Sequence, residues 1–214
     1  MKKTILSFLI ITCCNACFSQ TKFKEFVNEF EILALPLNNI PTLNKRDTLN
    51  GKFTNDIIIR SQNKKPQFLN KDGNIEIIKH YYGLYPEEPL KYGYRGEQLF
   101  FHSKITPIGR VSLDENYISL IIKVVDVEST FYDLWNFSKD GEVLSVVCLF
   151  WGLRDAGPRG EEVTFIIVNS EISIDGNVIW HENDNGLETF RTYELSENGL
   201  FKIIREEQQG EFEF

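Results

Sequence analysis

The sequence predicts a mainly β protein, in which an antiparallel meander forms a sandwich or a curled sheet after one short N-terminal amphipathic helix. From Leu99 onward, short apolar runs alternate with turn signals. Asp or Asn precedes Gly at three of these turns, a pair that is typical of β-hairpins. No crossover helix separates the runs, so we expect neighbouring strands to be antiparallel.

The composition is that of an ordinary globular domain, with 214 residues, 42% of them hydrophobic and 25% charged. The chain has 31 acidic and 23 basic residues, which gives a net charge of -8. Nucleic-acid-binding proteins display basic patches, so this balance argues against a nucleic-acid partner.

Residues 1–19 have the layout of a secretory signal peptide. Lys2 and Lys3 form a basic start, residues 4–12 are apolar, and small or polar residues follow. The apolar run is too short to cross a membrane, which takes about 20 residues. No later stretch is long and uncharged enough, so we expect no membrane-spanning segment.

Small residues at Cys17 and Ser19 favour cleavage that leaves Gln20 at the mature N-terminus. The alternative is lipidation of Cys17, which follows Ala16 but has Cys14 where a lipobox usually has Leu. The leader resembles signal peptides of the Bacteroidota. The predicted location is therefore the periplasm, the outer-membrane surface or the extracellular space.

Cleavage after Ser19 changes both the cysteine count and the charge. Only Cys148 remains, so no intramolecular disulfide can form, and the domain must depend on its hydrophobic core. Loss of Lys2 and Lys3 leaves 21 basic against 31 acidic residues, a net charge of -10. This acidity hints at a basic partner.

Residues 20–54 are expected to hold the N-terminal helix and a long connection. Apolar side chains recur at helical spacing and predict two to three turns: Phe23, Phe26, Val27 and Phe30. Pro36 and Pro41 follow the helix, and the sequence then becomes polar.

Residues 55–214 are expected to form a single antiparallel β domain. Strands are predicted near residues 56–60, 75–82, 98–103, 107–113, 116–127, 129–137, 142–151, 162–174, 177–182, 187–195 and 199–206. Asp140-Gly141, Asp175-Gly176 and Asn198-Gly199 predict hairpins with primed turns. The run Val143–Trp151 is apolar on both faces and is expected to be central, whereas the last two strands carry charges and are expected to form an edge hairpin.

The search for catalytic motifs is negative. The mature chain has no phosphate-binding loop, no nucleophile elbow, no HExxH and no CxxC. Cys148 lies in an apolar run and is interpreted as a buried structural thiol. His80, His102 and His181 are not spaced as metal ligands on one element, and residues 182–186 suit an acidic turn better than a calcium loop. We therefore predict no metal and no cofactor.

Two segments are candidates for binding. Residues 80–101 are rich in aromatic side chains among Gly and Pro, and the polar connection after the most apolar strand carries charges. The candidate residues are Tyr82, Tyr85, Tyr92, Tyr94 and Arg95 in the first segment, and Arg154, Asp155 and Arg159 in the second. The alternative is that the aromatic rings close one end of the core and the connection has no role.

No motif in the chain maps onto a known family. We therefore expect an exported, non-enzymatic β domain that binds a protein or a glycan in the bacterial envelope. One alternative is an inhibitor or immunity protein whose acidic face neutralises a basic toxin or enzyme. Others are a hydrolase with Asp, Glu or His residues gathered from several strands, and a structural or lipid-anchored envelope component.

Overall fold

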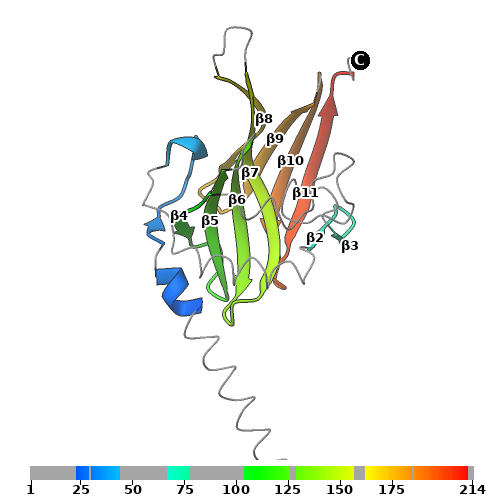
Figure 1. Ribbon diagram of the computed structural model, residues 1–214. Coiled ribbons are helices and arrows are strands. Elements are labelled where there is room, and N and C mark those ends of the chain that lie inside the picture. Colours follow the sequence, from blue (N-terminus) through cyan, green and yellow to red (C-terminus); the bar gives the residue numbers. More distant parts are fainter. Residues whose placement is uncertain are drawn as a thin grey trace, which may run out of the picture.

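The protein is mainly β, as the sequence predicts. The computed structural model describes residues 23–28, 30–43, 67–77, 104–125, 129–156, 162–184 and 186–211. They form one sheet of eleven strands, in the order β1-β4-β5-β6-β7-β8-β9-β10-β11-β2-β3, with a short helix at residues 23–28 (Figure 1). The eight consecutive strands β4 to β11 are antiparallel neighbours, which confirms the meander.

The eight meander strands are β4 (Lys104–Val111), β5 (Tyr117–Val125), β6 (Ser129–Ser138), β7 (Val143–Ala156), β8 (Glu162–Ile172), β9 (Val178–Asp184), β10 (Leu187–Leu195) and β11 (Phe201–Gln209). The short elements are β1 (Ile32–Leu33), the 3-10 helix η1 (Ile40–Thr42), β2 (Gln67–Leu69) and β3 (Ile75–Ile77). The predicted strands at 56–60 and 98–103 lie outside the described residues.

The N-terminal segment is more ordered than a connection. The helix spans residues 23–28 and is shorter than the predicted two to three turns. The chain then pairs in parallel with β4 through β1, and Leu37 forms an antiparallel bridge with Ile172 of β8. The bridge explains why this Pro-containing stretch is held: the N–H and C=O of Leu37 both bond to Ile172, at 2.8 and 2.9 Å.

The predicted hairpins are present, but their turns are not primed. Gly141, Gly176 and Gly199 have φ of 87°, 82° and 77°, whereas Asn39 is the one non-glycine residue among those described with positive φ. A type I′ turn needs positive φ at both central residues, so Asp-Gly here follows another geometry. The Gly141 N–H bonds to the Ser138 C=O at 3.0 Å, which gives a three-residue loop with Gly in the left-handed position.

The same loop recurs four times, with Ser or Asn first and Gly fourth. Ser138 Oγ accepts a bond from the Glu142 N–H, and Ser173 Oγ accepts one from the Asn177 N–H, each at 3.1 Å. The first side chain therefore reinforces the turn in which it lies. The four loops are residues 70–73, 138–141, 173–176 and 196–199.

The middle of the sheet is covered on both faces, as the apolar sequence of β7 predicts. All residues from 131 to 137 in β6 are buried, although successive side chains point to opposite faces. The helix covers one of these faces, where the Phe23 ring lies 5.2 Å from that of Phe137. The apolar stripe of the helix is thus buried on the sheet.

The polar connection after β7 is shorter than predicted. β7 continues to Ala156 and β8 begins at Glu162, with Arg154 opposite Thr164 and Asp155 opposite Val163. Pairing with β8 satisfies the backbone N–H and C=O groups of these residues. The strand therefore continues although their side chains are polar.

A buried polar row on β5, β6 and β7 binds the turn between β10 and β11. Ser119, Asn136 and Ser145 are cross-strand neighbours on β5, β6 and β7, and all three are buried. Asn136 Nδ2 donates to the Gly199 C=O at 2.7 Å, and the Phe201 N–H donates to Ser145 Oγ at 3.2 Å. We call this row and its bonds to the β10–β11 turn the Asn136 latch.

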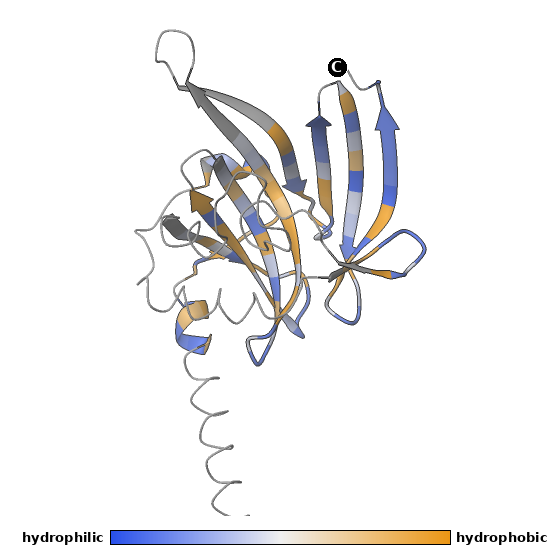
Figure 2. Cartoon of the chain, turned by 45° about the vertical axis from the view of Figure 1, so that its right-hand side comes forward, coloured by the Kyte–Doolittle hydropathy of each residue, from blue (hydrophilic) through white to orange (hydrophobic). Residues whose placement is uncertain are grey.

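The latch requires the sheet to fold back on itself. The β10–β11 turn lies against β5, where the Tyr117 hydroxyl donates to the Glu197 C=O at 2.5 Å. A Cβ atom on Gly199 would lie 2.5 Å from the Tyr117 ring, so this approach requires glycine. In Figure 2, β9–β11 diverge from the strands of the first half toward the top and meet them near the lower turns.

We expect Asn136→Ala to lower the free energy of unfolding by about 2–3 kcal/mol, because the Gly199 C=O and the Ser119 hydroxyl lose their partner inside the protein. Urea denaturation of the purified protein measures this change. The matched control is Asn116→Ala in the β4–β5 turn, where the exposed side chain lies outside the latch; it should change stability by less than about 0.5 kcal/mol. Equal effects of the two substitutions would contradict the latch.

Candidate functional site

The sequence-predicted binding residues are not brought together by the described part of the structure. Six of them lie outside the described residues: Tyr82, Tyr85, Tyr92, Tyr94, Arg95 and Arg159. The lipidation candidate Cys17 also lies outside them. Arg154 and Asp155 are described in their backbone alone, as paired residues of β7. Their binding role stays a prediction.

Cys148 fits the interpretation as a structural thiol, although the residue is half-buried rather than fully buried. It lies on β7 opposite the buried Asp133, and its Sγ donates to the Phe150 C=O at 3.4 Å. Burial raises the pKa of the Cys148 thiol well above its ordinary value, and the Asp133 charge raises it further. The group therefore stays protonated and poorly nucleophilic at neutral pH.

His181 is the one histidine in the described part of the chain, since His80 and His102 lie outside it. Within the same part, no group of three or more His, Cys, Asp or Glu side chains is arranged to hold a metal ion. The helix that is described is also too short and too polar to cross a membrane.

The best-defined exposed surface is one face of the hairpins formed by β8 to β11. His181 on β9 lies opposite Phe190 on β10, and the two rings stack at 4.4 Å with an angle of 3° between them. Ile179 on β9 and Ile204 on β11 are 43% and 46% exposed. We call this surface the His181 face. By register it comprises Asn169, Glu171, Ile179, His181, Asn183, Glu188, Phe190, Thr192, Glu194, Lys202, Arg205, Glu207 and Gln209; we add Ile204, the exposed extra residue where the β10–β11 register shifts.

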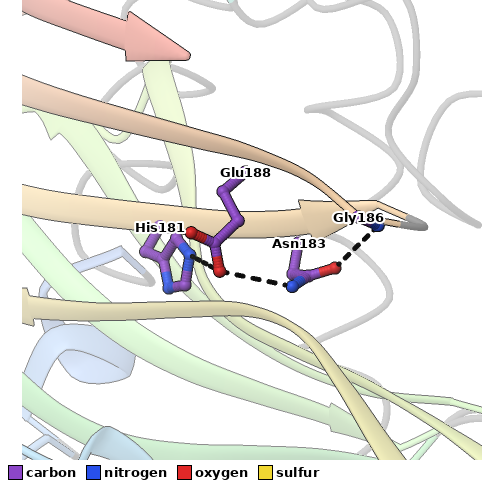
Figure 3. A network of polar contacts seen from close by, with 4 residues as sticks. All are labelled: His181, Asn183, Gly186 and Glu188. Atoms are coloured by element: carbon purple, nitrogen blue, oxygen red, sulfur yellow. Dashed lines mark hydrogen bonds and ion pairs between the residues drawn. The ribbon is translucent and has the colours of Figure 1, made fainter. Parts of the chain in front are cut away.

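Polar contacts fix the end of this face at the β9–β10 turn (Figure 3). Glu188 Oε1 lies 3.7 Å from His181 Nε2 and accepts a bond from Asn183 Nδ2 at 3.4 Å. Asn183 Oδ1 in turn accepts the Gly186 N–H at 3.4 Å. Residues 182–184 end β9 and Gly186 precedes β10, so the acidic segment lies at the hairpin connection between these strands.

The opposite face of the same strands is buried at Ser170, Trp180 and Tyr193, and it holds a cross-strand row that is more exposed toward β11. Ser170, Trp180, Arg191 and Glu206 are successive neighbours across β8, β9, β10 and β11. The Arg191 guanidinium lies 4.9 Å above the Trp180 ring, and its Nε donates to Glu206 Oε1 at 2.7 Å. This stack and ion pair link β9, β10 and β11 and stabilise the sheet on the side opposite the His181 face.

Two titratable groups border this row. Burial raises the pKa of the Tyr193 hydroxyl to about 12, although the nearby Arg191 charge acts in the opposite direction. Burial also raises the pKa of the Glu182 carboxyl, with Arg191 again opposing the shift and Asp184 adding to it. Both shifts arise because the charged form loses hydration at the edge of the core.

The charge of the His181 face is acidic. It carries the carboxylates of Glu171, Glu188, Glu194 and Glu207 against the cations Lys202 and Arg205. The acidity that the whole sequence shows is therefore present on this surface as well. Apolar side chains and acidic groups alternate across it.

Comparisons with known proteins found no match, whether with family models, with curated protein sequences or with solved structures.

The raised pKa of Glu182 predicts the pH dependence of stability. The folded state binds this proton more tightly than the unfolded state, so the contribution to stability is full below the unfolded pKa of 4.5 and is lost as the pH rises through the folded value. Glu182→Gln should therefore stabilise the protein at pH 7, by less than about 1 kcal/mol because the carboxyl is partly solvated, and the gain should shrink at about pH 4. Urea titrations at both pH values measure it; a loss of stability at pH 7 would contradict the assignment.

Proposed function

We propose that this protein is an exported, non-enzymatic binding protein that recognises a protein partner through the His181 face. The observation that carries the proposal is a partly exposed apolar strip on the sheet, formed by the exposed Ile179 and Ile204 and the half-buried Phe190. Water-exposed apolar groups gathered on one rigid surface are typical of protein-binding sites.

The side chains of the strip favour a protein over a glycan. Sugars stack on open aromatic rings, whereas the Phe190 ring is already stacked on His181. Ile179 and Ile204 offer branched aliphatic surface, which packs against apolar side chains of a partner.

The charges around the strip suit a basic partner. Four carboxylates against two cations give the face a negative potential, which attracts a basic surface and orients it before contact. Inhibition of a basic toxin or enzyme is one form of this binding. Cleavage after Ser19, with lipidation of Cys17 as its alternative, and the envelope location remain part of the proposal.

The double variant Ile179→Ser with Phe190→Ser tests the proposal. The exported protein is immobilised, incubated with envelope and culture extracts of its host, and the captured proteins are quantified by mass spectrometry. We expect the double variant to capture roughly tenfold less, or lower still, of one or more basic proteins. Substitutions at the centre of an interface have effects of this size.

Ile174→Ser is the matched control, because Ile174 is 66% exposed in the β8–β9 turn, outside the His181 face. It should capture the same proteins as the unmodified chain. Identical capture by all three forms, or binding that survives protease treatment of the extract, would contradict a protein partner on this face.

A further inference from the structure

Over most of its length, the outer edge of β11 has no pairing strand within the part of the chain that the structure describes. β10 pairs along the whole inner edge of β11, whereas β2 pairs on the outer side with Phe201 and Lys202 alone. Among the described residues, no strand pairs with 203–209 on that side. Such an edge presents backbone N–H and C=O groups that can pair with another strand.

Two opposite charges, Arg205 and Glu207, lie on either side of Glu206 along this edge. Arg205 and Glu207 are exposed on the His181 face, with their side chains 70% and 49% accessible, and they contact each other at 2.6 Å. Glu206 lies between them and points to the opposite face, where it accepts the bond from Arg191. The order along the strand is thus cation, neutralised acid, anion.

This order is complementary to itself in an antiparallel pair. With Glu206 of one copy opposite Glu206 of a second, Arg205 of each copy lies opposite Glu207 of the other. Moving the centre by one residue places Arg205 opposite Arg205 or Glu207 opposite Glu207. The charges therefore favour one register and disfavour its neighbours, and the two Glu206 carboxylates are already neutralised by their own Arg191.

We propose that the outer edge of β11 binds a second copy of this chain, antiparallel and centred on Glu206, to give a two-fold symmetric dimer with a continuous sheet. The seven-residue edge is small compared with standard interfaces of about 1,200–2,000 Å². The dimer is therefore weak, concentration-dependent and sensitive to salt, because its charge pairs are exposed.

The pairing extends the His181 face across both copies. Arg205 and Glu207 belong to this face, so each copy would present its strip next to that of the other. Two weak contacts with a partner that is itself dimeric or repetitive then act together, which raises the overall affinity. The dimer does not depend on the proposed binding function.

Charge reversal tests the register. Sedimentation equilibrium of the exported, purified protein is measured over a wide concentration range for the unmodified chain, Arg205→Glu, Glu207→Arg and the double variant. Each single variant places like charges opposite each other twice per dimer, so we expect its self-association to weaken roughly tenfold. The double variant restores both opposite-charge pairs and should associate within about threefold of the unmodified chain.

Mixing the two single variants gives the sharpest comparison. Arg205→Glu carries two acids and Glu207→Arg carries two bases at the edge, so the two variants should form a heterodimer more readily than either variant pairs with itself. Lys202→Glu is the matched control, because Lys202 is on the same face but pairs with β2. A chain that is monomeric at every concentration, single variants that associate as before, or a mixture that stays monomeric would overturn the proposal.

Discussion

A buried side-chain amide carries the constraint on which the rest of the structure depends. Asn136 lies near the C-terminal end of β6, accepts a hydrogen bond from the Ser119 hydroxyl at 2.8 Å and donates to the Gly199 C=O at 2.7 Å. A buried amide without these partners would be costly, and so would an unpaired Gly199 carbonyl, so each group requires the other. The bond holds the β10–β11 turn against β6, and the sheet has to fold back on itself to make it.

The placement of the last hairpin determines which surfaces are open. Once the β10–β11 turn is held, one face of β8 to β11 is buried over Trp180 and Tyr193, and the opposite face is left to solvent. The Arg191 stack and its ion pair with Glu206 then keep the strands in register from the buried side. A preformed face loses less conformational entropy on binding, which supports recognition by a surface that contains few anchoring side chains.

The sequence predicted the parts of the fold that have a period. Eight long strands were visible as apolar runs, and the central position of β7 followed from Val143–Trp151. By contrast, β1 and β2 have two and three residues in polar or Pro-containing sequence, where no alternation can develop. The primed turns were wrong because an Asp-Gly pair does not specify loop length; Ser138 and its equivalents select the longer loop. The His181 face was missed because Ile179 and Phe190 alternate as core residues do, and the packing of neighbouring strands decides which face is covered.

The most direct test of this account is native-state hydrogen exchange at the backbone amide of Phe201, whose proton is bonded to Ser145 Oγ on β7. If the latch holds the β10–β11 turn against β6 and β7, this amide opens only when the whole domain unfolds. Its exchange should then report the global free energy of unfolding, of the order of 5–15 kcal/mol for a domain of this size. Exchange as fast as that of an exposed turn amide, in a protein whose β6 and β7 amides remain protected, would contradict it.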